Sequence, residues 1–363
     1  MIKVGINGFG RIGRLVLRAA LAQQDIAVKA INNRSDAENM AYLFKYDSVQ
    51  GRYPGAVGHL EDALLIDGRE IRVCHADDPA NIPWGKLDVD VVIECTGAFL
   101  TGESAAGHLE GGASKVVISA PAKGSPDVPT IVIGVNDHIL TPDDNIVSNA
   151  SCTTNCLAPM VKVLHEAFGI ENGLMTTIHS YTRDQSLVDQ SHKDPRRGRA
   201  AGVSLVPTST GAASAIGQVI PQLKGKLDGM AVRVPTADGS FTDLVATVRQ
   251  AATPESINEV FCQAADGPLY GIIEYNEDPL VSADIVGNPH SCVFDPSSTL
   301  VTGDHLVKIC AWYDNEWGYA NRCIDLVYRL AQPASKSQFN DTYTAETDIV
   351  PFTFNKAALL NRL

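Results

Sequence analysis

One cysteine of this 363-residue chain lies in an unusual setting, the segment SNASCTTNCLAP from Ser148 to Pro159. Small and hydroxyl side chains surround Cys152 where an apolar helical pattern begins. A thiol at a helix N-terminus is expected to have a lowered pKa, and the thiolate is the form that attacks carbonyl carbon. Cys152 is therefore a candidate nucleophile, whereas Cys156 fits a small buried hydrophobic residue on the apolar face.

A thiolate nucleophile needs a base to take its proton. Of the nine histidines, His179 ends the run LMTTIHSYTRDQ, where a strand gives way to a polar loop. His179 is the candidate base if the fold brings it to Cys152, and is otherwise structural or exposed. No H-E-x-x-H motif occurs, and Cys152 and Cys156 lack a second pair of ligands, so we expect no metal site.

A glycine-rich segment, VGINGFGRIGRLVL, places Gly8, Gly10 and Gly13 in G-x-G-x-x-G spacing between a strand and a helix. We expect Gly8 to allow the tight turn, Gly10 to admit a pyrophosphate and Gly13 to permit close packing of helix on strand. The helix N-terminus would attract the phosphates. The alternative is a glycine-rich turn without a ligand.

Cations and hydroxyl groups gather in SHKDPRRGRAAG, PTSTGAAS and AVRVPTADG. A basic run is often only a solvated face. In this acidic chain, however, arginine beside neutral donors suits phosphate groups, so we favour an anionic substrate.

The composition, 45% hydrophobic and 20% charged residues, is typical of a globular protein. A net charge of −13 argues against binding along a nucleic-acid backbone. No apolar run predicts a membrane helix, and the N-terminus enters a strand without a signal-peptide pattern. The eight cysteines show no framework spacing, which is typical of reduced thiols. We expect a cytoplasmic protein without a nucleic-acid or membrane partner.

The first 150 residues alternate strands rich in Val and Ile with amphipathic helices, which predicts a doubly wound, Rossmann-type α/β sheet. The expected strands are residues 3–6, 27–31, 89–95, 116–119, 131–134 and 146–148, and the expected helices are 11–23 and 36–46.

After about residue 150 the pattern changes. A helix is expected from Cys152 to Phe168, with Gly169 as its stop signal. The longer alternating strands that follow predict an α+β catalytic domain with a mostly antiparallel sheet. We expect a dinucleotide-binding domain at 1–151, a catalytic domain at 152–315, a C-terminal helix returning to the first domain at 316–330, and an appended polar tail at 331–363.

From about Ile2 to Leu330, the chain resembles the phosphorylating glyceraldehyde-3-phosphate dehydrogenase family. The resemblance rests on NGFGRIGR, KYDSVQGRY, DPANIPW, ECTGAF, VISAPAK, NASCTTNCLAP, TTIHSYT, HKDPRRGRAA, TSTGAA, GMAVRVPT and WYDNEWGY. NASCTTNCLAP is the most specific of these motifs.

The resemblance implies a reaction. Cys152 attacks the aldehyde of glyceraldehyde 3-phosphate to form a hemithioacetal, and His179 is the general base. Hydride transfer to nicotinamide leaves a thioester, which inorganic phosphate cleaves to 1,3-bisphosphoglycerate. The resemblance assigns Thr182 and Arg233 to the substrate phosphate. It assigns inorganic phosphate to Ser151, Thr153, Thr210 and Gly211, with Arg197 bridging the region.

The resemblance also implies a homotetramer and a cofactor site. Asn315 is expected to hold the nicotinamide carboxamide, and Tyr319 to lie near the ring. The expected cofactor-binding residues are Gly8, Gly10, Arg11, Ile12, Gly13, Asn33, Arg34, Ser35, Thr96, Ser119, Ser191, Asn315 and Tyr319.

The second strand ends in an unusual way for this family. NAD-specific relatives usually carry Asp where this chain has Asn33, and Leu-Pro where it has Gln190-Ser191. Arg34 could pair with a 2′-phosphate, and Ser35 or Ser191 could donate to it, so we favour use of NADP, alone or beside NAD. Alternatively, Asn33 still bonds the ribose and Arg34 points to solvent. Asp77, where many relatives carry a basic residue, argues against NADP.

Two other functions stay open. Erythrose-4-phosphate dehydrogenases are similar, but depart from the motifs that hold Thr182, Thr210 and Gly211 here. A non-catalytic, nucleotide-bound interaction protein would not require the Cys152 and His179 that this chain keeps.

Overall fold

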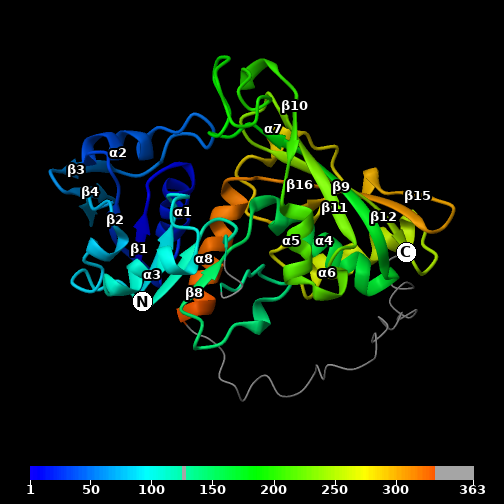
Figure 1. The fold of residues 1–363 in the computed structure, drawn as a ribbon, viewed down its shortest axis with the longest axis horizontal. Helices are drawn as coiled ribbons and strands as arrows, with labels where there is room; N and C mark the ends of the chain where they lie inside the picture. Colours follow the sequence, from blue (N-terminus) through cyan, green and yellow to red (C-terminus); the bar gives the residue numbers. More distant parts are fainter. Residues whose placement is uncertain (125–127, 332–363) are drawn as a thin grey trace.

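The structure, a computed structural model, describes residues 1–124 and 128–331. Two lobes, each built on an eight-stranded sheet, lie side by side (Figure 1). The tail predicted at 331–363 lies outside the described residues, except for Ala331.

The first sheet has the strand order β3-β4-β5-β2-β1-β6-β7-β8. The strands β5-β2-β1-β6-β7-β8 are parallel, and β3 and β4 join the β5 edge as antiparallel strands. This confirms the doubly wound α/β sheet. The strands are β1 Ile2–Asn7, β2 Ile26–Asn32, β3 Val57–Leu60, β4 Ala63–Ile66, β5 Arg69–Cys74, β6 Val91–Glu94, β7 Lys115–Ile118 and β8 Ile146–Ser148.

Helices α1 (Arg11–Leu21), α2 (Ala37–Lys45) and α3 (Gly102–Glu110) belong to this first lobe. The sequence pattern placed α1 and α2 within two residues of their observed ends, because their apolar spacing matches the helical period. Five short 3-10 helices occur in the described part of the chain, at Pro79–Asn81, Asp137–Ile139, Ala201–Val203, Pro221–Leu223 and Pro296–Ser298.

One predicted strand was wrong. Residues 131–134 form a loop and turn instead of a strand. Gly134 has a φ of +80°, and the side chain of Asn136 accepts from the Val132 amide, so the backbone curls away from the sheet after one bridge between Thr130 and Ser148. Strands β3 to β5 were not predicted; β3 and β5 are partly exposed and lack a buried apolar run.

The second sheet has the order β10-β11-β9-β12-β16-β14-β13, with β15 paired to β16. Most neighbours are antiparallel, as predicted, while β11–β9 and β13–β14 are parallel. The strands are β9 Ile170–Ser180, β10 Val206–Ser209, β11 Leu227–Val234, β12 Ser240–Val248, β13 Ile273–Tyr275, β14 Cys292–Phe294, β15 Leu300–Thr302 and β16 Leu306–Tyr313.

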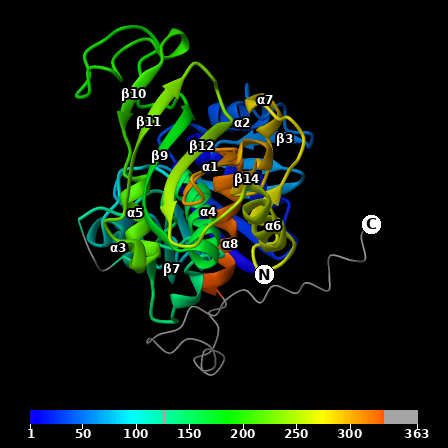
Figure 2. The same cartoon turned by 90° about the vertical axis from the view of Figure 1, so that its right-hand side faces the viewer.

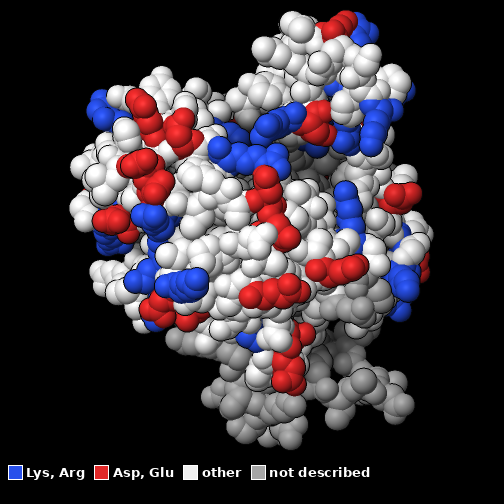
Figure 3. Space-filling view, turned by 60° about the vertical axis from the view of Figure 1, so that its left-hand side comes forward, with Lys and Arg blue, Asp and Glu red and all other residues white. Residues whose placement is uncertain are grey.

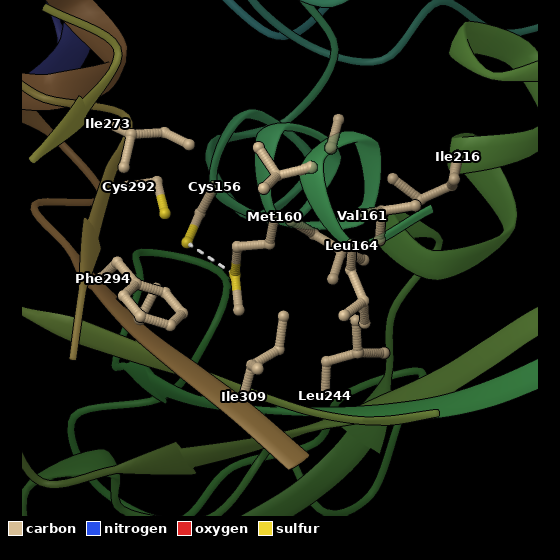
Figure 4. Close-up of a cluster of buried hydrophobic side chains, with 14 of the residues drawn as sticks. Cys156, Met160, Val161, Leu164, Ile216, Leu244, Ile273, Cys292, Phe294 and Ile309 are labelled. Carbon is tan, nitrogen blue, oxygen red and sulfur yellow. Dashed lines mark hydrogen bonds between the residues drawn. The ribbon is translucent and has the colours of Figure 1, made fainter. Parts of the chain in front are cut away.

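Helix α4 (Cys152–Phe168) is the central helix of the second lobe. It starts and stops where the sequence predicted, with Gly169 at a φ of +72° beyond its end. Figure 4 shows Met160 and Leu164 directed toward Leu244 and Ile309 of the sheet. Helices α5 (Ala212–Val219), α6 (Pro254–Asp266) and α7 (Ser282–Ile285) complete this lobe.

Helix α8 (Trp317–Ala331) returns to the first lobe, where its apolar face joins the core formed by α1 and the first sheet. Between β9 and β10, residues 181–205 project beyond the ends of the sheets in both Figures 1 and 2.

Among the described residues, no helix is long and apolar enough to cross a membrane. On the face drawn in Figure 3, acidic and basic side chains are interspersed, with one group of basic side chains in the hollow beside the projecting segment. That face therefore lacks the continuous basic surface on which a nucleic-acid backbone would bind.

Candidate active site

The three glycines of the G-x-G-x-x-G segment have different steric surroundings. Gly8 has a φ of +93°, and a Cβ there would lie 2.8 Å from the Thr96 amide nitrogen. A Cβ on Gly13 would lie 2.1 Å from the Gly8 carbonyl oxygen, whereas a Cβ on Gly10 would meet nothing within 4 Å. Gly8 thus forms the turn, Gly13 permits close packing, and Gly10 leaves open space at the N-terminus of α1, as a pyrophosphate requires.

Arg11 and Ile12 open helix α1, so their amide groups belong to the free N-terminal turn. The Arg11 side chain is otherwise engaged: its guanidinium pairs with Asp47, at 2.7 Å, and with Glu316 beside α8. These pairs tie α1 to α8, so the backbone of Arg11, more than its charge, is free for a phosphate.

At the end of β2, Asn33 is partly buried and its side-chain oxygen accepts from the Phe9 amide at 3.2 Å. The Arg34 Nε lies 2.9 Å from the Asp77 carboxylate, and the two side chains are 87% and 78% exposed. Arg34 therefore has a carboxylate partner that any 2′-phosphate would have to replace. Ser35 is exposed beside this pair.

A buried polar network, not predicted from the sequence, lies under the carboxyl ends of the strands. The Glu94 carboxylate at the end of β6 accepts from Asn7, His108 and Thr96, and Trp84 donates to the other nitrogen of His108. Thr96 is exposed above Glu94, and the Ser119 amide bonds the Glu94 carbonyl, so both lie along the strand ends where a cofactor would pass. The sequence signal for this network was the charged residue Glu94 at the end of the apolar run VVIE.

Cys152 is the first residue of α4, and the chain reaches it through a tight turn after β8. Ala150 has a φ of +53°, a conformation that side chains rarely adopt, and Tyr319 donates to its carbonyl at 3.0 Å. Ser151 caps the helix by accepting from the Thr154 amide. The buried Tyr319 hydroxyl from α8 therefore holds the turn that presents Cys152.

The structure brings Cys152 and His179 together, with 3.5 Å between Sγ and Nε2. His179 Nδ1 lies 2.7 Å from the Ser180 carbonyl oxygen and 3.0 Å from Arg233 Nη1, on the neighbouring strand. Because one ring nitrogen cannot both donate and accept, we assign the proton to Nδ1, donating to Ser180. Arg233 donates to the same carbonyl, and Nε2 is left as an acceptor facing the thiol.

The resting pair is neutral. Burial and the charge of Arg233 together lower the pKa of His179 to about 3. Burial also raises the pKa of Cys152 to about 11, although Arg233 opposes that shift. The prediction of a lowered thiol pKa was wrong, because packing around the sulfur outweighs the groups that stabilise its anion.

Arg233 and Thr182 lie around one carboxylate, that of Asp184. Thr182 donates its hydroxyl to Asp184, and Arg197 Nη1 lies 2.6 Å from the same side chain. The hydrogen bond from Thr182 lowers the pKa of Asp184, and the charges of Arg233 and Arg197 add to this effect. The buried Arg233 Nε has no hydrogen-bond partner among the described residues. The Arg233 guanidinium beside His179 therefore has one donor free for an anion.

The second predicted anion site combines two helix N-termini, those of α4 and α5. Gly211 is the residue before α5, and Thr210 accepts from the Ala212 amide. Ser151 lies at the cap of α4, but the Thr153 hydroxyl is buried and bonded to Tyr313 at 2.9 Å. Thr153 therefore has only its backbone free to face an anion.

Asn315 is buried between β16 and α8, and its side-chain oxygen accepts from Ser240 at 2.6 Å. This bond orients the amide so that its nitrogen can donate to a carboxamide. Ser191 is exposed on the projecting segment, and among the described residues no hydrogen bond joins it to Arg34. Within one chain, the structure does not assemble the predicted 2′-phosphate site.

Comparisons with known proteins agree with this geometry. Residues 2–102 match the family model "Glyceraldehyde 3-phosphate dehydrogenase, NAD binding domain", and residues 151–315 match "Glyceraldehyde 3-phosphate dehydrogenase, C-terminal domain". The chain belongs to the glyceraldehyde-3-phosphate dehydrogenase family. The second match begins one residue before Cys152 and ends at Asn315.

Curated members of the glyceraldehyde-3-phosphate dehydrogenase family are similar over most of their length. The chain is 54% identical to glyceraldehyde-3-phosphate dehydrogenase 2 of Streptomyces avermitilis over 327 residues, which are 90% of this chain and 97% of the relative. It is 51% identical to glyceraldehyde-3-phosphate dehydrogenase 2 of Bacillus subtilis over 331 residues, 91% and 97% of the two chains. A relative from Geobacillus stearothermophilus is 53% identical over 331 residues, 91% and 98% of the two chains. Membership makes the chain a dehydrogenase with a nicotinamide dinucleotide cofactor.

Proposed function

We propose that the protein oxidises glyceraldehyde 3-phosphate to 1,3-bisphosphoglycerate, reversibly, using inorganic phosphate. The observation that carries the proposal is the 3.5 Å contact between Cys152 Sγ and His179 Nε2, beside the Arg233 guanidinium, whose Nε has no hydrogen-bond partner among the described residues. A nucleophile, a base and an anion site are the parts that thioester formation on a phosphorylated aldehyde requires.

The first step follows from the protonation states of the pair. The neutral Nε2 of His179 takes the thiol proton as Cys152 attacks the aldehyde carbon, and returns it to the aldehyde oxygen, which gives a hemithioacetal. Arg233 and Thr182 hold the substrate phosphate in this step. A bound nicotinamide dinucleotide supplies the hydride acceptor, and Asn315 holds its carboxamide. Oxidation leaves a thioester on Cys152.

Inorganic phosphate then attacks the thioester carbonyl carbon, and the Cys152 sulfur is the leaving group. Ser151, Gly211 and the Thr153 amide offer donors at the two helix N-termini, while Arg197 supplies a nearby positive charge. The expected test compares reduction of the dinucleotide with and without inorganic phosphate. Erythrose 4-phosphate as the better substrate would instead favour the related dehydrogenase.

We further propose that the enzyme uses NADP as well as NAD. Asn33 places no negative charge at the end of β2, and Arg34 is exposed beside it. Against this, Asp77 already pairs with Arg34, so a 2′-phosphate must compete for the guanidinium. The measurement is kcat/KM for NAD and NADP side by side, and a strong NAD preference would contradict the proposal.

We propose a homotetramer in a reducing, cytoplasmic compartment, with the four segments outlined above as its domains and tail. The projecting segment supports oligomerisation, since Leu187 is 88% and Val203 is 83% exposed on it. A contribution of Ser191 to a 2′-phosphate site would require this segment from another copy. A reducing compartment is supported by the free thiols of Cys74, Cys95, Cys152, Cys156, Cys292, Cys310 and Cys323. Light scattering of the purified protein measures the oligomer, and a monomer would contradict it.

A further inference from the structure

Two buried carboxylates lie close together where the two lobes meet. Asp238 lies in the turn between β11 and β12, and Asp314 lies between β16 and α8, with 2% and 1% of their surfaces exposed. The Gln50 side-chain nitrogen lies 2.9 Å from Asp238 and 3.0 Å from Asp314, so one amide donor bridges both. Among the described residues, no ion pair reaches either carboxylate. We refer to Asp238 and Asp314 as the acid pair.

The hydrogen bonds show which member of the acid pair carries a proton. Asp314 accepts four N–H bonds, from Gln50, Gly287 and the amides of Glu316 and Trp317 at the start of α8. Asp238 accepts only from Gln50 and from the adjacent Gly239 amide. Since donors stabilise an ionised carboxylate, Asp238, which receives fewer of them, is the member of the pair that favours the protonated form.

The charges around Asp238 favour the same assignment. Burial and the nearby charges of Asp314 and Glu316 together raise the pKa of Asp238 to about 9. Glu316 and Asp47 both pair with Arg11, so that cation is not available to Asp238. From the side of α7, the backbone of Ser282 lies against the turn and brings no charge.

The acid pair adjoins the bond that orients Asn315. Asp238 precedes Ser240 by two residues, and Asp314 directly precedes Asn315. Ser240 donates to Asn315 at 2.6 Å and accepts from the Ser180 amide at 3.1 Å. Gly239 between them has a φ of +82°, and a Cβ there would lie 2.2 Å from the Ser282 carbonyl oxygen. Two negative charges in this crowded turn would push Ser240 and Asn315 apart.

The acid pair also affects the nucleophile, because a negative charge on Asp238 would raise the pKa of Cys152. We propose that Asp238 is a positioning residue that acts as a protonated acid, sharing its proton with Asp314. The proton holds Ser240 against Asn315 and keeps a second negative charge away from Cys152. The part concerning Asn315 rests on the proposed function, in which Asn315 holds the nicotinamide.

The test compares the wild-type protein with Asp238→Asn between pH 7.5 and 10, with NAD as the cofactor. If only the protonated form binds well, the wild-type KM for NAD rises about tenfold by one pH unit above the pKa of Asp238. Asp238→Asn keeps a neutral donor beside Asp314, so its KM stays flat over the same range. Asp228→Asn is the matched control, since exposed Asp228 also accepts from the next glycine amide, and among the described residues no bridging donor joins it to a second carboxylate. Parallel KM profiles for wild type and Asp238→Asn would overturn the proposal.

A spectroscopic measurement separates this inference from the proposed function. Infrared difference spectra of the wild-type protein are expected to show the C=O band of a buried protonated carboxylic acid at neutral pH, with loss of that band above about pH 9. Asp238→Asn removes the band, and Asp228→Asn keeps it. This readout does not require turnover, and wild type alone reports it if Asp238→Asn fails to fold. Absence of the band at neutral pH would refute the protonated acid, whatever the activity.

Discussion

The pairing of Arg34 with Asp77 predicts how cofactor preference responds to a single uncharged substitution. Asp77→Asn removes a carboxylate that lies 2.9 Å from the Arg34 guanidinium and would repel a 2′-phosphate. The site of the change is highly exposed, so the fold is expected to be unaffected.

The magnitude follows from exposure. A solvent-exposed ion pair contributes about 0–1 kcal/mol, so freeing Arg34 from Asp77 is worth no more than about 1 kcal/mol to a competing phosphate. That corresponds to an increase of up to about fivefold in kcat/KM for NADP, with no change for NAD. Arg34→Gln has the larger and opposite effect. Loss of a charge-assisted bond of about 1.5–3 kcal/mol lowers kcat/KM for NADP by about 10- to 100-fold.

The assay is steady-state kinetics with each dinucleotide at two salt concentrations. The effect of Asp77→Asn is expected to shrink at the higher one, because salt screens exposed charges. Asp62→Asn is the matched control, since Asp62, in the turn before β4, also forms an exposed pair with an arginine, Arg72 of β5, at 3.2 Å. If Asp77→Asn changed kcat/KM equally for NAD and NADP, or lowered it for NADP, Arg34 would not be the group that binds the 2′-phosphate.

Three further predictions concern the glycines of the G-x-G-x-x-G segment, the general base His179, and the stability of the protein in acid. Gly13→Ala places a Cβ 2.1 Å from a backbone oxygen, so it is expected to lower the free energy of unfolding by about 1–3 kcal/mol in urea titrations. Gly10→Ala places its Cβ in open space, so it is expected to keep the stability and to weaken dinucleotide binding, measured by calorimetry. Equal stability losses in both would contradict these steric assignments. His179→Asn is expected to lower kcat by about 10²- to 10⁴-fold and to slow alkylation of Cys152 by iodoacetamide at neutral pH; an unchanged alkylation rate would mean that His179 does not take the thiol proton. Hydrogen bonds from His290 and two asparagines lower the pKa of Glu274 from 4.5 to about 2. Ionised Glu274 therefore stabilises the folded state by at most about 3 kcal/mol above pH 4.5, and this stabilisation is lost as the pH falls toward 2. The melting temperatures of wild type and Glu274→Gln should therefore differ at pH 7 and converge in acid, and a constant gap would exclude this linkage.

Local patterns predicted the parts of the site that depend on neighbouring residues. The spacing of Gly8, Gly10 and Gly13 fixes their steric roles within a single turn and helix start, and each was observed where predicted. Cys152 and His179 were each placed correctly at the end of an element. Their 3.5 Å contact could not be read from pattern alone, because it depends on how α4 packs on β9.

Features that depend on burial or on distant pairing could not be predicted from the sequence. The prediction of a lowered thiol pKa was wrong because a helix N-terminus is a local signal, whereas the desolvation of Cys152 comes from the whole surrounding core. Asp238 and Asp314 are 76 positions apart in the chain and meet through Gln50 of the other lobe. No spacing rule connects such residues, and the same holds for the bond from Tyr319 to the Ala150 carbonyl.

The central claim is that Cys152 forms a thioester that only inorganic phosphate releases efficiently. The most direct measurement is rapid-mixing absorbance of the reduced dinucleotide after addition of glyceraldehyde 3-phosphate, first without and then with inorganic phosphate. Without phosphate, we expect a burst that does not exceed the number of sites. Sustained turnover is expected once phosphate is added, and no burst is expected in Cys152→Ser. Equal turnover with and without phosphate, or a full burst in Cys152→Ser, would contradict the central claim.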